Sequence, residues 1–307
     1  MNFVRLLHQR RMTAISGRIC TCMNFVMSIA EKNKVKREYI ETGKCIWCGR
    51  TKEDGATFFN IPHILPHALG GKETCFDVCD ECNSYFGDDR KKYGISQDEA
   101  VKGILQIGKH YFSLNPKQEK SPIFNYFVSK HKISLKRSIL HSITAQGLTR
   151  QFKRGMCECF LQKYHFLTKE GNSPFFDKLR KFARYDEGDI PFYCVINKIL
   201  IGFIDQKNPI IGMSQKDIAN VKRCGLFTCY IFGHVIIMDV VPNAPHIEKM
   251  IFCDDLSNLG IIGGSTISIE RLSDISKLDL LYTRYNGFHS AALSDTEAYM
   301  PFIEEPK

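Results

Sequence analysis

The clearest helical pattern in the chain covers residues 149–168. Its apolar residues recur at positions i, i+4, i+7 and i+8, which lie on one face of a helix; they are Phe152, Met156, Cys159 and Phe160. The basic residues of the segment fall outside this face; they are Arg150, Lys153, Arg154 and Lys163. The pattern predicts a helix that packs its apolar face against a core.

A second helix is predicted for residues 175–185, directly after the turn-forming residues 171–174. Ser173 can cap this helix with its hydroxyl, and Pro174 can occupy the first helical position, where its missing N–H has no partner to lose. The predicted helix is strongly basic, with Lys178, Arg180, Lys181 and Arg184 along it. A further short helix is predicted for residues 99–110.

Strand patterns lie on both sides of the two basic helices. Residues 132–136 alternate apolar and polar side chains with a period of two. Residues 191–203 and 226–241 are rich in Val, Ile, Phe and Tyr and are bounded by Gly, Pro and Asn, which indicates buried strands. Residues 265–270 predict another strand. Helices and strands together predict an α+β fold.

By composition the chain divides into three parts. Residues 1–30 have no acidic residue and four arginines, which is typical of a transit peptide; a translation start placed too early, with Met23 or Met27 as the true start, explains the segment equally well. Residues 40–95 are dense in Cys, His, Gly and Asp, and we predict a small domain organised by a metal. Residues 100–307 are predicted to form a mixed helical and β-rich C-terminal domain.

Four of the 13 cysteines form two Cys-x-x-Cys pairs, Cys45/Cys48 and Cys79/Cys82, with 30 residues between them. Each spacing lets two thiolates reach one tetrahedral ion at about 2.3 Å, so the sequence predicts a structural Zn²⁺ site with these four ligands. The second pair can also begin a helix with both sulfurs on one face. Two redox-active dithiols are the alternative.

Further residues stand in a fixed order around these pairs. Residues 63–71 read His-Ile-Leu-Pro-His-Ala-Leu-Gly-Gly, and Cys82 is followed directly by Asn83. With the cysteine pairs, these residues resemble the HNH endonuclease family. Its ββα-metal finger carries Cys-x-x-Cys, then His-Ile-x-Pro-x-x-Leu-Gly-Gly, then Cys-x-x-Cys-Asn. The resemblance covers residues 45–90 and implies a nuclease within the domain at 40–95.

The resemblance implies catalytic roles for two residues. His63 matches the general base of the family, which takes a proton from the water that attacks a phosphodiester. Asn83 matches the last letter of the family name. One residue past Cys82, it is turned by about 100° from the thiolates and can offer its carboxamide oxygen to a catalytic divalent cation, Mg²⁺ or Mn²⁺. Soft sulfur would thus bind zinc and hard oxygen the catalytic ion.

One position departs from the family pattern. Many members carry Asp or Glu directly before the histidine as a ligand of the catalytic metal, and this chain has Pro62 there. Four nearby residues offer substitutes, and the sequence does not choose among them: His67, Asp77, Asp88 and Asp89. The alternative is a finger that has kept its zinc, lost its catalytic metal, and binds nucleic acid without cutting it.

The distribution of charge points to a polyanionic partner. The net charge is +9, and residues 101–185 contain 17 basic and 4 acidic residues. Basic side chains release counterions from a phosphate backbone, so nucleic acid, with DNA first, is the predicted partner. Backbone contacts are predicted for residues of the basic helices at 149–185: Arg150, Lys153, Arg154, Lys178, Arg180, Lys181 and Arg184. Solvated helix faces are the alternative.

Composition limits the remaining classes of protein. A chain of 307 residues that are 44% hydrophobic can bury a full core, and no apolar run approaches the roughly 20 residues of a membrane helix. We therefore predict a cytoplasmic, metal-dependent HNH-type endonuclease that hydrolyses DNA phosphodiester bonds. The alternatives are a zinc-finger nucleic-acid-binding protein with a degenerate, non-catalytic HNH site, and a protein-interaction module in which zinc is only a scaffold.

Overall fold

The computed structural model describes residues 37–112, 123–127, 132–136, 144–196, 211–232, 234–259, 268–273 and 299–300. The chain divides into two units, residues 1–38 and 39–307, and all helices and strands with described bounds belong to the second unit. The predicted extension at 1–30 lies outside the described residues. Within the described ranges, no helix is both long and apolar enough to cross a bilayer.

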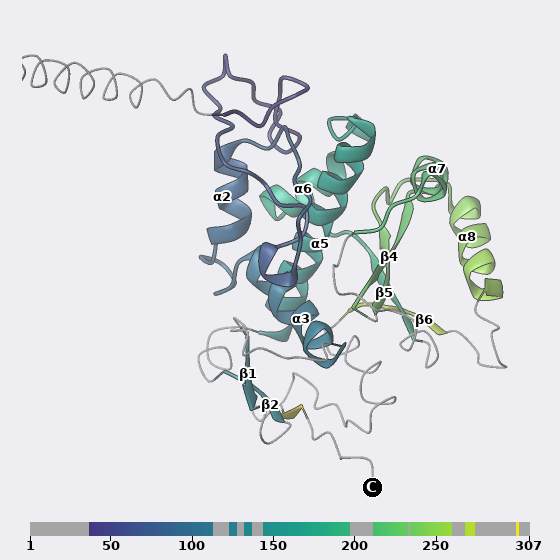
Figure 1. Ribbon diagram of the computed structural model, residues 1–307. Coiled ribbons are helices and arrows are strands. Elements are labelled where there is room, and N and C mark those ends of the chain that lie inside the picture. Colours follow the sequence, from purple (N-terminus) through teal and green to yellow (C-terminus); the bar gives the residue numbers. More distant parts are fainter. Residues whose placement is uncertain are drawn as a thin grey trace, which may run out of the picture. The chain divides into compact units, whose positions relative to one another are not determined.

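The first part of the second unit, residues 39–88, is called the finger. Its β contacts are two isolated antiparallel bridges, Lys44–Thr51 and His63–Thr74. A short 3-10 helix, η1 (His67–Leu69), lies between the two residues of the second bridge. Helix α2 (Asp80–Asp88) follows, with Cys79 as its N-terminal cap, so the second cysteine pair begins a helix as predicted (Figure 1).

The buried apolar side chains of the finger join the same core as the helices and the sheet that follow. Trp47, the only tryptophan of the chain, is buried and meets Phe86 of α2 edge to face, with ring centroids 4.8 Å apart. Asp80, in the first turn of α2, accepts hydrogen bonds from the backbone N–H groups of Phe59 (2.9 Å) and Asn60 (2.7 Å). These bonds tie the segment before His63 to the helix.

Helix α5 (Ala145–Thr168) is the centre of the helical layer, with α3 (Gln97–Phe112) packed along it (Figure 1). It begins at Thr144, whose hydroxyl accepts a hydrogen bond from the N–H of Gly147 at 3.0 Å. The predicted apolar face is buried, but so are polar side chains on the rest of the helix, including Gln151, Lys153 and Arg154. Residues 147–165 of α5 are therefore almost entirely enclosed by protein, which the amphipathic pattern does not reveal, whereas Phe166 and Leu167 near its end are exposed.

The second basic helix begins as the sequence predicts. The Ser173 hydroxyl accepts from the N–H of Phe175 at 3.3 Å, and Pro174 opens the 3-10 helix η3 (Pro174–Phe176), which continues into α6 (Asp177–Tyr185). Leu179, Phe182 and Ala183 are buried, and α6 packs against α5. The basic residues of α6 occupy the remaining positions.

The C-terminal strands form one antiparallel sheet. Its order is β4 (Leu226–Ile231), β5 (His234–Asp239), β3 (Phe192–Ile196) and β6 (Ser268–Arg271). The predicted strand region 226–241 is thus a hairpin, in which Phe227 lies opposite Met238. Residues 197–203 and 265–267, at the edges of two predicted strand regions, lie outside the described residues.

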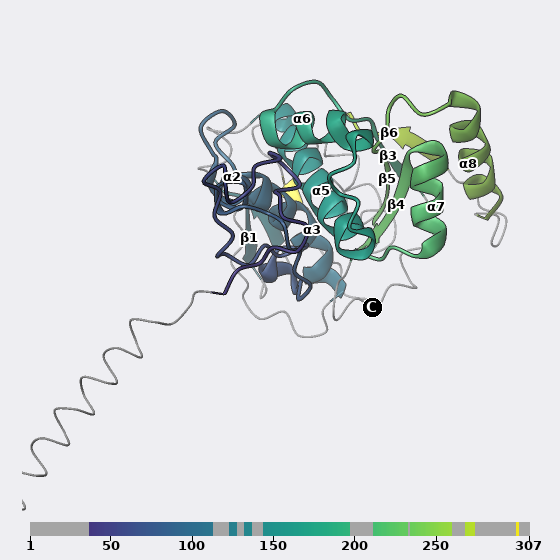
Figure 2. The ribbon, with the colours of Figure 1, turned by 90° about the horizontal axis from the view of Figure 1, so that it is seen from above.

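Both faces of this sheet are covered (Figure 2). On one face, Phe160 of α5 meets Phe227 of β4 with ring centroids 5.1 Å apart. On the other face lie α7 (Gln215–Cys224) and α8 (His246–Leu259), and Phe252 of α8 packs with Val235 and Ile237. Burial on both faces explains why these strands are apolar at consecutive positions.

A smaller antiparallel sheet is formed by β1 (Phe124–Phe127), β2 (Lys132–Leu135) and β7 (Tyr299–Met300). Strand β2 coincides with the predicted strand at 132–136. In the described residues, six α-helices and the four-stranded antiparallel sheet confirm the predicted α+β class.

Candidate metal centre and catalytic site

The two cysteine pairs meet in space. The sulfur atoms of Cys45, Cys48, Cys79 and Cys82 all lie within 4.8 Å of one another, and the sulfurs of Cys48 and Cys79 are 3.7 Å apart. Four sulfurs around one tetrahedral zinc ion at about 2.3 Å would be separated by about 3.8 Å. The cluster therefore has the size of a four-cysteine zinc site, and its convergence favours one metal site over two separate dithiols.

The first pair belongs to a tight turn that aims N–H groups at sulfur. The N–H of Gly49 donates to the carbonyl of Cys45 at 2.9 Å, and Gly49 has the left-handed φ of 74° that this turn requires. The Cys45 sulfur accepts from the backbone N–H groups of Trp47 at 3.5 Å and Cys79 at 3.4 Å. Such donors stabilise the thiolate form that binds metal.

Two arginines compensate the negative charge of the cluster. Arg50 donates to the Cys48 sulfur at 3.5 Å, and Arg184 of α6 donates to the Cys82 sulfur at 3.3 Å. Both guanidinium groups also pair with Glu81. Hydrogen bonds from the neighbouring thiols, chiefly Cys45, lower the pKa of the Cys48 thiol. Four thiolates around one Zn²⁺ carry a charge of −2, and the two arginines, which also pair with Glu81, offset part of it.

His63 lies on the surface of the finger, in the bridge to Thr74. The loop that follows is compact: Gly70 ends η1 with a left-handed φ of 95°, and a Cβ on Gly71 would lie 2.0 Å from the carbonyl oxygen of Leu65. The Gly-Gly pair therefore closes the end of this loop, within which η1 carries His67 back toward His63. The two imidazole centroids are 5.7 Å apart.

The surroundings of His63 lower its pKa. Partial burial is the main cause, the neighbouring His67 acts in the same direction, and the charge of Asp98 in the first turn of α3 opposes both. A lowered pKa favours the neutral imidazole of His63, which is the form that can accept a proton.

Asn83 lies in the first turns of α2, one residue past Cys82, with a half-buried side chain. Its backbone N–H donates to the carbonyl of Cys79 at 2.9 Å, which belongs to the helical hydrogen bonds of this end. The orientation expected for its carboxamide, away from the thiolates, stays a prediction.

Asp77 has a structural role. Its buried carboxylate accepts from the N–H groups of Glu41 (2.7 Å) and Thr42 (2.9 Å) and bonds to Nε2 of His165 on α5 at 2.9 Å. Burial opposes ionisation, but the bonds to His165, Glu41 and Thr42 outweigh it and lower the pKa of Asp77. With its oxygens so engaged, Asp77 is the wrong choice as a substitute ligand of the catalytic metal.

The other substitutes differ in position. Asp88 and Asp89 lie at the far end of α2, where Asp88 is exposed beside Arg90 at 3.9 Å. His67, which the sequence treated as one of four options, is the one beside His63. Among the described residues, the four cysteines are the only group of three or more His, Cys, Asp or Glu side chains with ligand atoms this close together.

Sequence reasoning missed two acidic residues, Asp98, which acts on His63, and Glu158, which is influenced by Asp98. Asp98 acts on the charge of His63 and pairs with Lys102 at 3.2 Å. Glu158 of α5 is buried, accepts from Gln162 at 2.9 Å, and has a pKa raised first by burial and then by Asp98. Glu158 is the only acidic residue of α5, and this isolated charge in the sequence could have drawn attention to it. Nothing in the residue spacing links Asp98 to His63.

The seven basic residues predicted to hold nucleic acid are dispersed. Arg154 is 2% exposed and donates to the carbonyls of Phe182 and Ala183 and to the hydroxyl of Tyr85. Lys153 is buried and pairs with Asp189 at 2.5 Å. Both cations are engaged inside the protein.

Three arginines of the set form hydrogen bonds to loop residues or to the cysteine cluster. Arg150 bonds to the carboxylate of Asp186 at 2.5 Å and to the carbonyl of Gly188 at 3.0 Å. Arg180 bonds to the carbonyl of Gly171 at 2.7 Å. Arg184 lies at the Cys82 sulfur, with its guanidinium 4.0 Å from the ring centroid of Tyr85.

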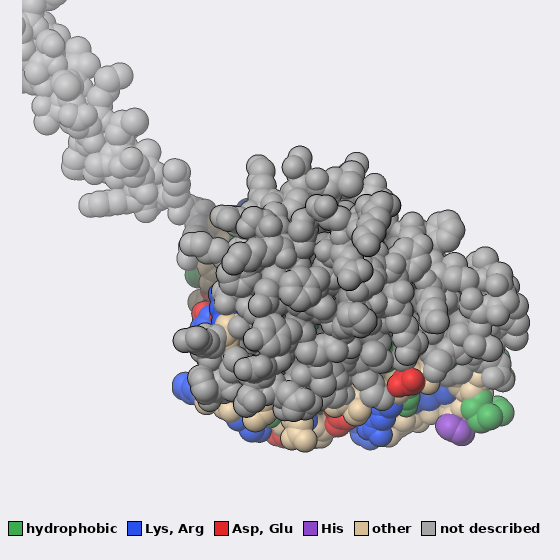
Figure 3. Space-filling model, turned by 90° about the horizontal axis from the view of Figure 1, so that it is seen from below, with side chains coloured by type: hydrophobic (Ala, Val, Ile, Leu, Met, Phe, Trp, Pro, Cys, Tyr) green, Lys and Arg blue, Asp and Glu red, His purple; other side chains and the backbone are tan. Residues whose placement is uncertain are grey.

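Lys178 and Lys181 are the exposed members of the set. On the face of the molecule in Figure 3, Lys and Arg side chains of described residues are interspersed with Asp and Glu. A single basic patch over the helices at 149–185 is not formed by these seven side chains. Their contact with nucleic acid stays a prediction, which the two exposed lysines support best.

Residues 45–97 match the family model of the HNH endonucleases. This region contains the four-cysteine cluster, His63 and Asn83. It is therefore an HNH endonuclease domain, a kind of domain that acts on nucleic acids, and it indicates nuclease activity. Neither a curated protein nor a solved structure matches the chain.

Proposed function

We propose that this protein is a metal-dependent endonuclease that hydrolyses DNA phosphodiester bonds, with His63 as the general base. The observation that carries the proposal is the state of His63: an exposed imidazole with a lowered pKa, inside the region that matches the HNH endonucleases. Only the neutral imidazole can accept a proton, and a lowered pKa keeps it neutral at pH 7.

The hydrolysis needs one proton acceptor and one leaving group. The oxygen of a water molecule forms a bond to phosphorus while one of its protons moves to the free ring nitrogen of His63. The P–O ester bond opposite the attacking oxygen breaks, and its electron pair stays on the ester oxygen, which takes up a proton from solvent. His63 then returns its proton to solvent.

Two kinds of metal fit the residues present. The four sulfurs, with N–H and arginine donors around them, suit structural Zn²⁺. Asn83, a carboxamide on the α2 end that carries the cysteines, is the residue we assign to Mg²⁺ or Mn²⁺. Mg²⁺ keeps several waters and needs few protein ligands, so the lack of a carboxylate at Pro62 is compatible with it. When bound, the cation stabilises charge on the phosphate.

The proposal divides the work between two domains. Residues 40–95 carry the chemistry, and residues 100–307 hold the DNA and support the finger. The exposed Lys178 and Lys181 would contact phosphates, while the paired Arg150, Lys153, Arg154, Arg180 and Arg184 would fix the helices on which they stand.

One observation favours a second candidate function, DNA binding without cleavage. Pro62 is buried, and its carbonyl accepts from the N–H of Cys75 at 2.9 Å, so this position is part of the bridge between the two β segments. A finger with a purely structural residue beside its histidine would keep its zinc and bind DNA as a scaffold.

Cleavage of supercoiled plasmid by the zinc-loaded protein with Mg²⁺ or Mn²⁺ tests the proposal. We expect His63→Ala to lose about 10²- to 10⁴-fold of the nicking rate. Asn83→Ala should lose nicking and raise the Mg²⁺ concentration needed. His246→Ala, which removes an exposed histidine outside the finger, is the matched control and should cut normally. Zinc content and circular dichroism establish that each variant is folded.

Two results would contradict this mechanism. Unchanged nicking by a folded His63→Ala protein would exclude the general base. A well-folded wild type that binds DNA in a salt-sensitive way and never cuts it would establish the second candidate function instead.

A further inference from the structure

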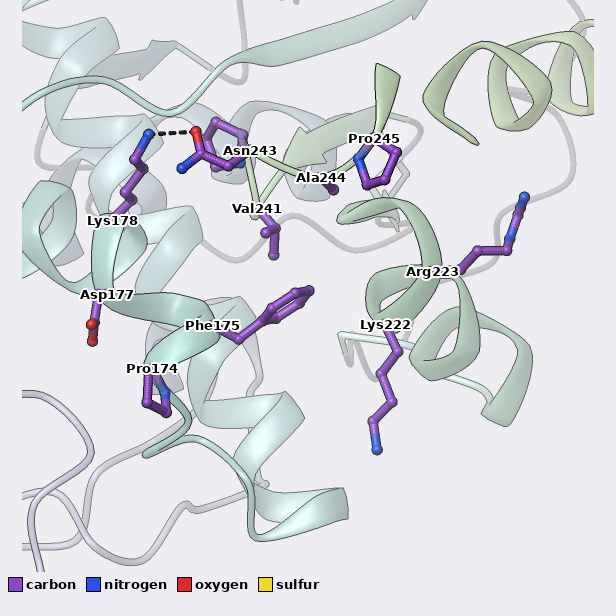
Figure 4. Close-up of a pocket in the computed structure, with 11 residues that line it drawn as sticks. Pro174, Phe175, Asp177, Lys178, Lys222, Arg223, Val241, Asn243, Ala244 and Pro245 are labelled. Carbon is purple, nitrogen blue, oxygen red and sulfur yellow. Dashed lines mark hydrogen bonds between the residues drawn. The ribbon is translucent and has the colours of Figure 1, made fainter. Parts of the chain in front are cut away.

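A cavity of about 510 Å³ lies away from the cysteine cluster, at the opposite end of α6 (Figure 4). Its walls come from η3, α6, α7 and the loop 241–245 that leaves β5. This volume is within the range of small-molecule sites, about 300–1,000 Å³. The proposed nuclease mechanism does not use it.

An exposed aromatic ring forms one wall of the cavity. Phe175 is 40% exposed, and in Figure 4 its ring projects from η3 toward Val241. The neighbouring Phe176 is buried and meets Phe175 edge to face, with ring centroids 5.4 Å apart. With Ser173 and Pro174 fixing the turn before it, Phe175 is a rigid aromatic platform that leaves part of its surface open.

The remaining walls carry an excess of positive charge. Lys178 stands three residues after Phe175, and its ammonium group donates to the carboxamide oxygen of Asn243 at 2.6 Å, a neutral partner that leaves the charge uncompensated. Lys222 of α7 pairs with Glu170 at 2.9 Å, but both side chains are about half exposed, and such pairs are weak. The one acidic lining residue, Asp177, is already bound by Arg180.

We propose that this cavity binds an unpaired nucleotide of a DNA strand, with the base stacked on Phe175 and the flanking phosphates on Lys178 and Lys222. A base stacks on an aromatic ring through its π face, which is accessible in a single strand and covered in a duplex. Cations on two walls provide the charge complementarity for the two phosphates. This inference names the part of the substrate that the proposed nuclease binds, so it rests on the proposed function.

Helix α6 links the cavity to the finger. Lys178 is at its first turn and Arg184, six residues later, contacts the Cys82 sulfur. Six residues of α-helix span about 9 Å, so one bound strand can touch both ends. The cavity would therefore hold a single-stranded segment of DNA near the zinc cluster of the nuclease domain, and we expect it to favour substrates with an unpaired segment.

Fluorescence anisotropy with a labelled twelve-residue oligo(dT) and a blunt duplex of equal length tests the inference on the full, zinc-loaded chain without Mg²⁺. We expect Phe175→Ala to weaken binding of oligo(dT) about 5- to 100-fold, with a smaller effect on the duplex. Lys178→Ala and Lys222→Ala should each reduce the slope of log affinity against log salt by about 0.7. Phe175→Ala should leave that slope unchanged.

Phe166→Ala is the matched control, since Phe166 is also 40% exposed and stands beside Lys163 and Lys169, outside the cavity. It should bind oligo(dT) like the wild type. Phe175→Trp, which keeps an aromatic ring at this position, should bind oligo(dT) like the wild type. If Phe175→Ala binds oligo(dT) normally, or loses as much affinity for the duplex, the inference is wrong and the cavity belongs to another kind of ligand.

Plasmid cleavage separates this inference from the proposed function. If the wild type never cuts DNA and Phe175→Ala selectively loses affinity for oligo(dT), the nuclease function is excluded and the nucleotide site is supported. If cleavage depends on His63 and Phe175→Ala binds oligo(dT) normally, the nuclease function is supported and the nucleotide site is excluded.

Discussion

The finger and the four-stranded sheet are stabilised in different ways. In the finger, two single-residue bridges and one nine-residue helix surround four sulfur atoms that converge on one point. In the sheet, strands of four to six residues are covered by apolar side chains on both faces. We therefore expect the finger to depend on a bound metal as well as on its apolar contacts, whereas the sheet depends on apolar area removed from water.

The two regions share one continuous apolar core, and polar contacts with α5 and α6 also link them. Asp77 bonds to His165 of α5, Glu73 pairs with Lys163 of α5 at 2.5 Å, and Arg184 of α6 reaches the Cys82 sulfur. Each contact has a charged partner in the finger or at the cluster. The difference between the two regions can therefore be tested by removing the metal, by truncating the core, or by substituting these polar links.

Removal of zinc should have the largest effect. Structural zinc sites contribute about 10–16 kcal/mol of folding free energy, so a chelator or Cys79→Ser should unfold the finger. Hydrogen exchange should show loss of protection over residues 39–88 and retained protection in β4 and β5. Cys157→Ala, which removes a buried cysteine of α5, should keep the zinc. Equal loss of protection in both regions would show that they unfold as one.

Truncation of a core side chain should destabilise the helical and sheet region and leave the zinc of the finger in place. Phe160 is fully buried against Tyr164, Phe176 and Phe227, and Phe160→Ala should cost about 3–5 kcal/mol in the free energy of unfolding of the helical and sheet region. Denaturant unfolding measures this cost, and zinc content should stay unchanged. Phe166→Ala, at an exposed position of the same helix, should change stability by less than about 0.5 kcal/mol. Release of zinc by Phe160→Ala would contradict the independence of the finger.

The link at Asp77 should have an intermediate effect that depends on pH. Its pKa is lower in the folded protein than the unfolded value of about 3.9, so its contribution is present above that pH and is lost as the pH falls through the folded pKa. Asp77→Asn should cost about 1.5–3 kcal/mol at pH 7 and progressively less below about pH 4.

Unfolding free energies between pH 3 and 7 measure this difference directly. Both proteins lose zinc as their thiolates are protonated in acid, so zinc content is measured at each pH and the comparison is made where both proteins still hold the metal. Asp88→Asn, at a side chain that is 78% exposed, is the control and should leave stability near wild type at every pH. A constant difference between Asp77→Asn and wild type over the whole range would exclude the ionised carboxylate as the source.

The smallest expected effect concerns the pH dependence of cleavage. His67→Gln removes a like charge beside His63, so the pKa of His63 should rise and the acid limb of kcat/KM should move to higher pH by less than about one unit. Asp98→Asn should move the limb in the opposite direction, because the charge of Asp98 raises that pKa. A pH profile unaffected by both changes would indicate that the limb does not report His63.

The cysteine spacing predicted the cluster correctly because ligand geometry is local. Two residues in a Cys-x-x-Cys turn must present their sulfurs together, and a metal needs two such turns. The start of α6 was predictable for the same reason, since Ser173 and Pro174 act on the adjacent backbone. The hairpin of β4 and β5 followed from a long β-rich region, although its turn was not located.

What the sequence did not reveal concerns contacts between elements. The prediction that Arg154 reaches phosphate rested on its charge alone, and the spacing did not show that its guanidinium is buried and bonded to carbonyls of α6. Asp77 was considered as a ligand because it lies near His63 in sequence, but a left-handed φ of 64° directs it to α5. Neither outcome follows from spacing, since each depends on which element packs on which.

The position of Trp47 makes the protein its own optical reporter. The chain has a single tryptophan, and it lies buried inside the cysteine turn, against Phe86. Its emission, excited selectively at long wavelength, therefore comes from the finger alone, while the tyrosines and phenylalanines are spread over the chain. Gain or loss of the metal can be followed in the unlabelled protein from the wavelength of this one signal.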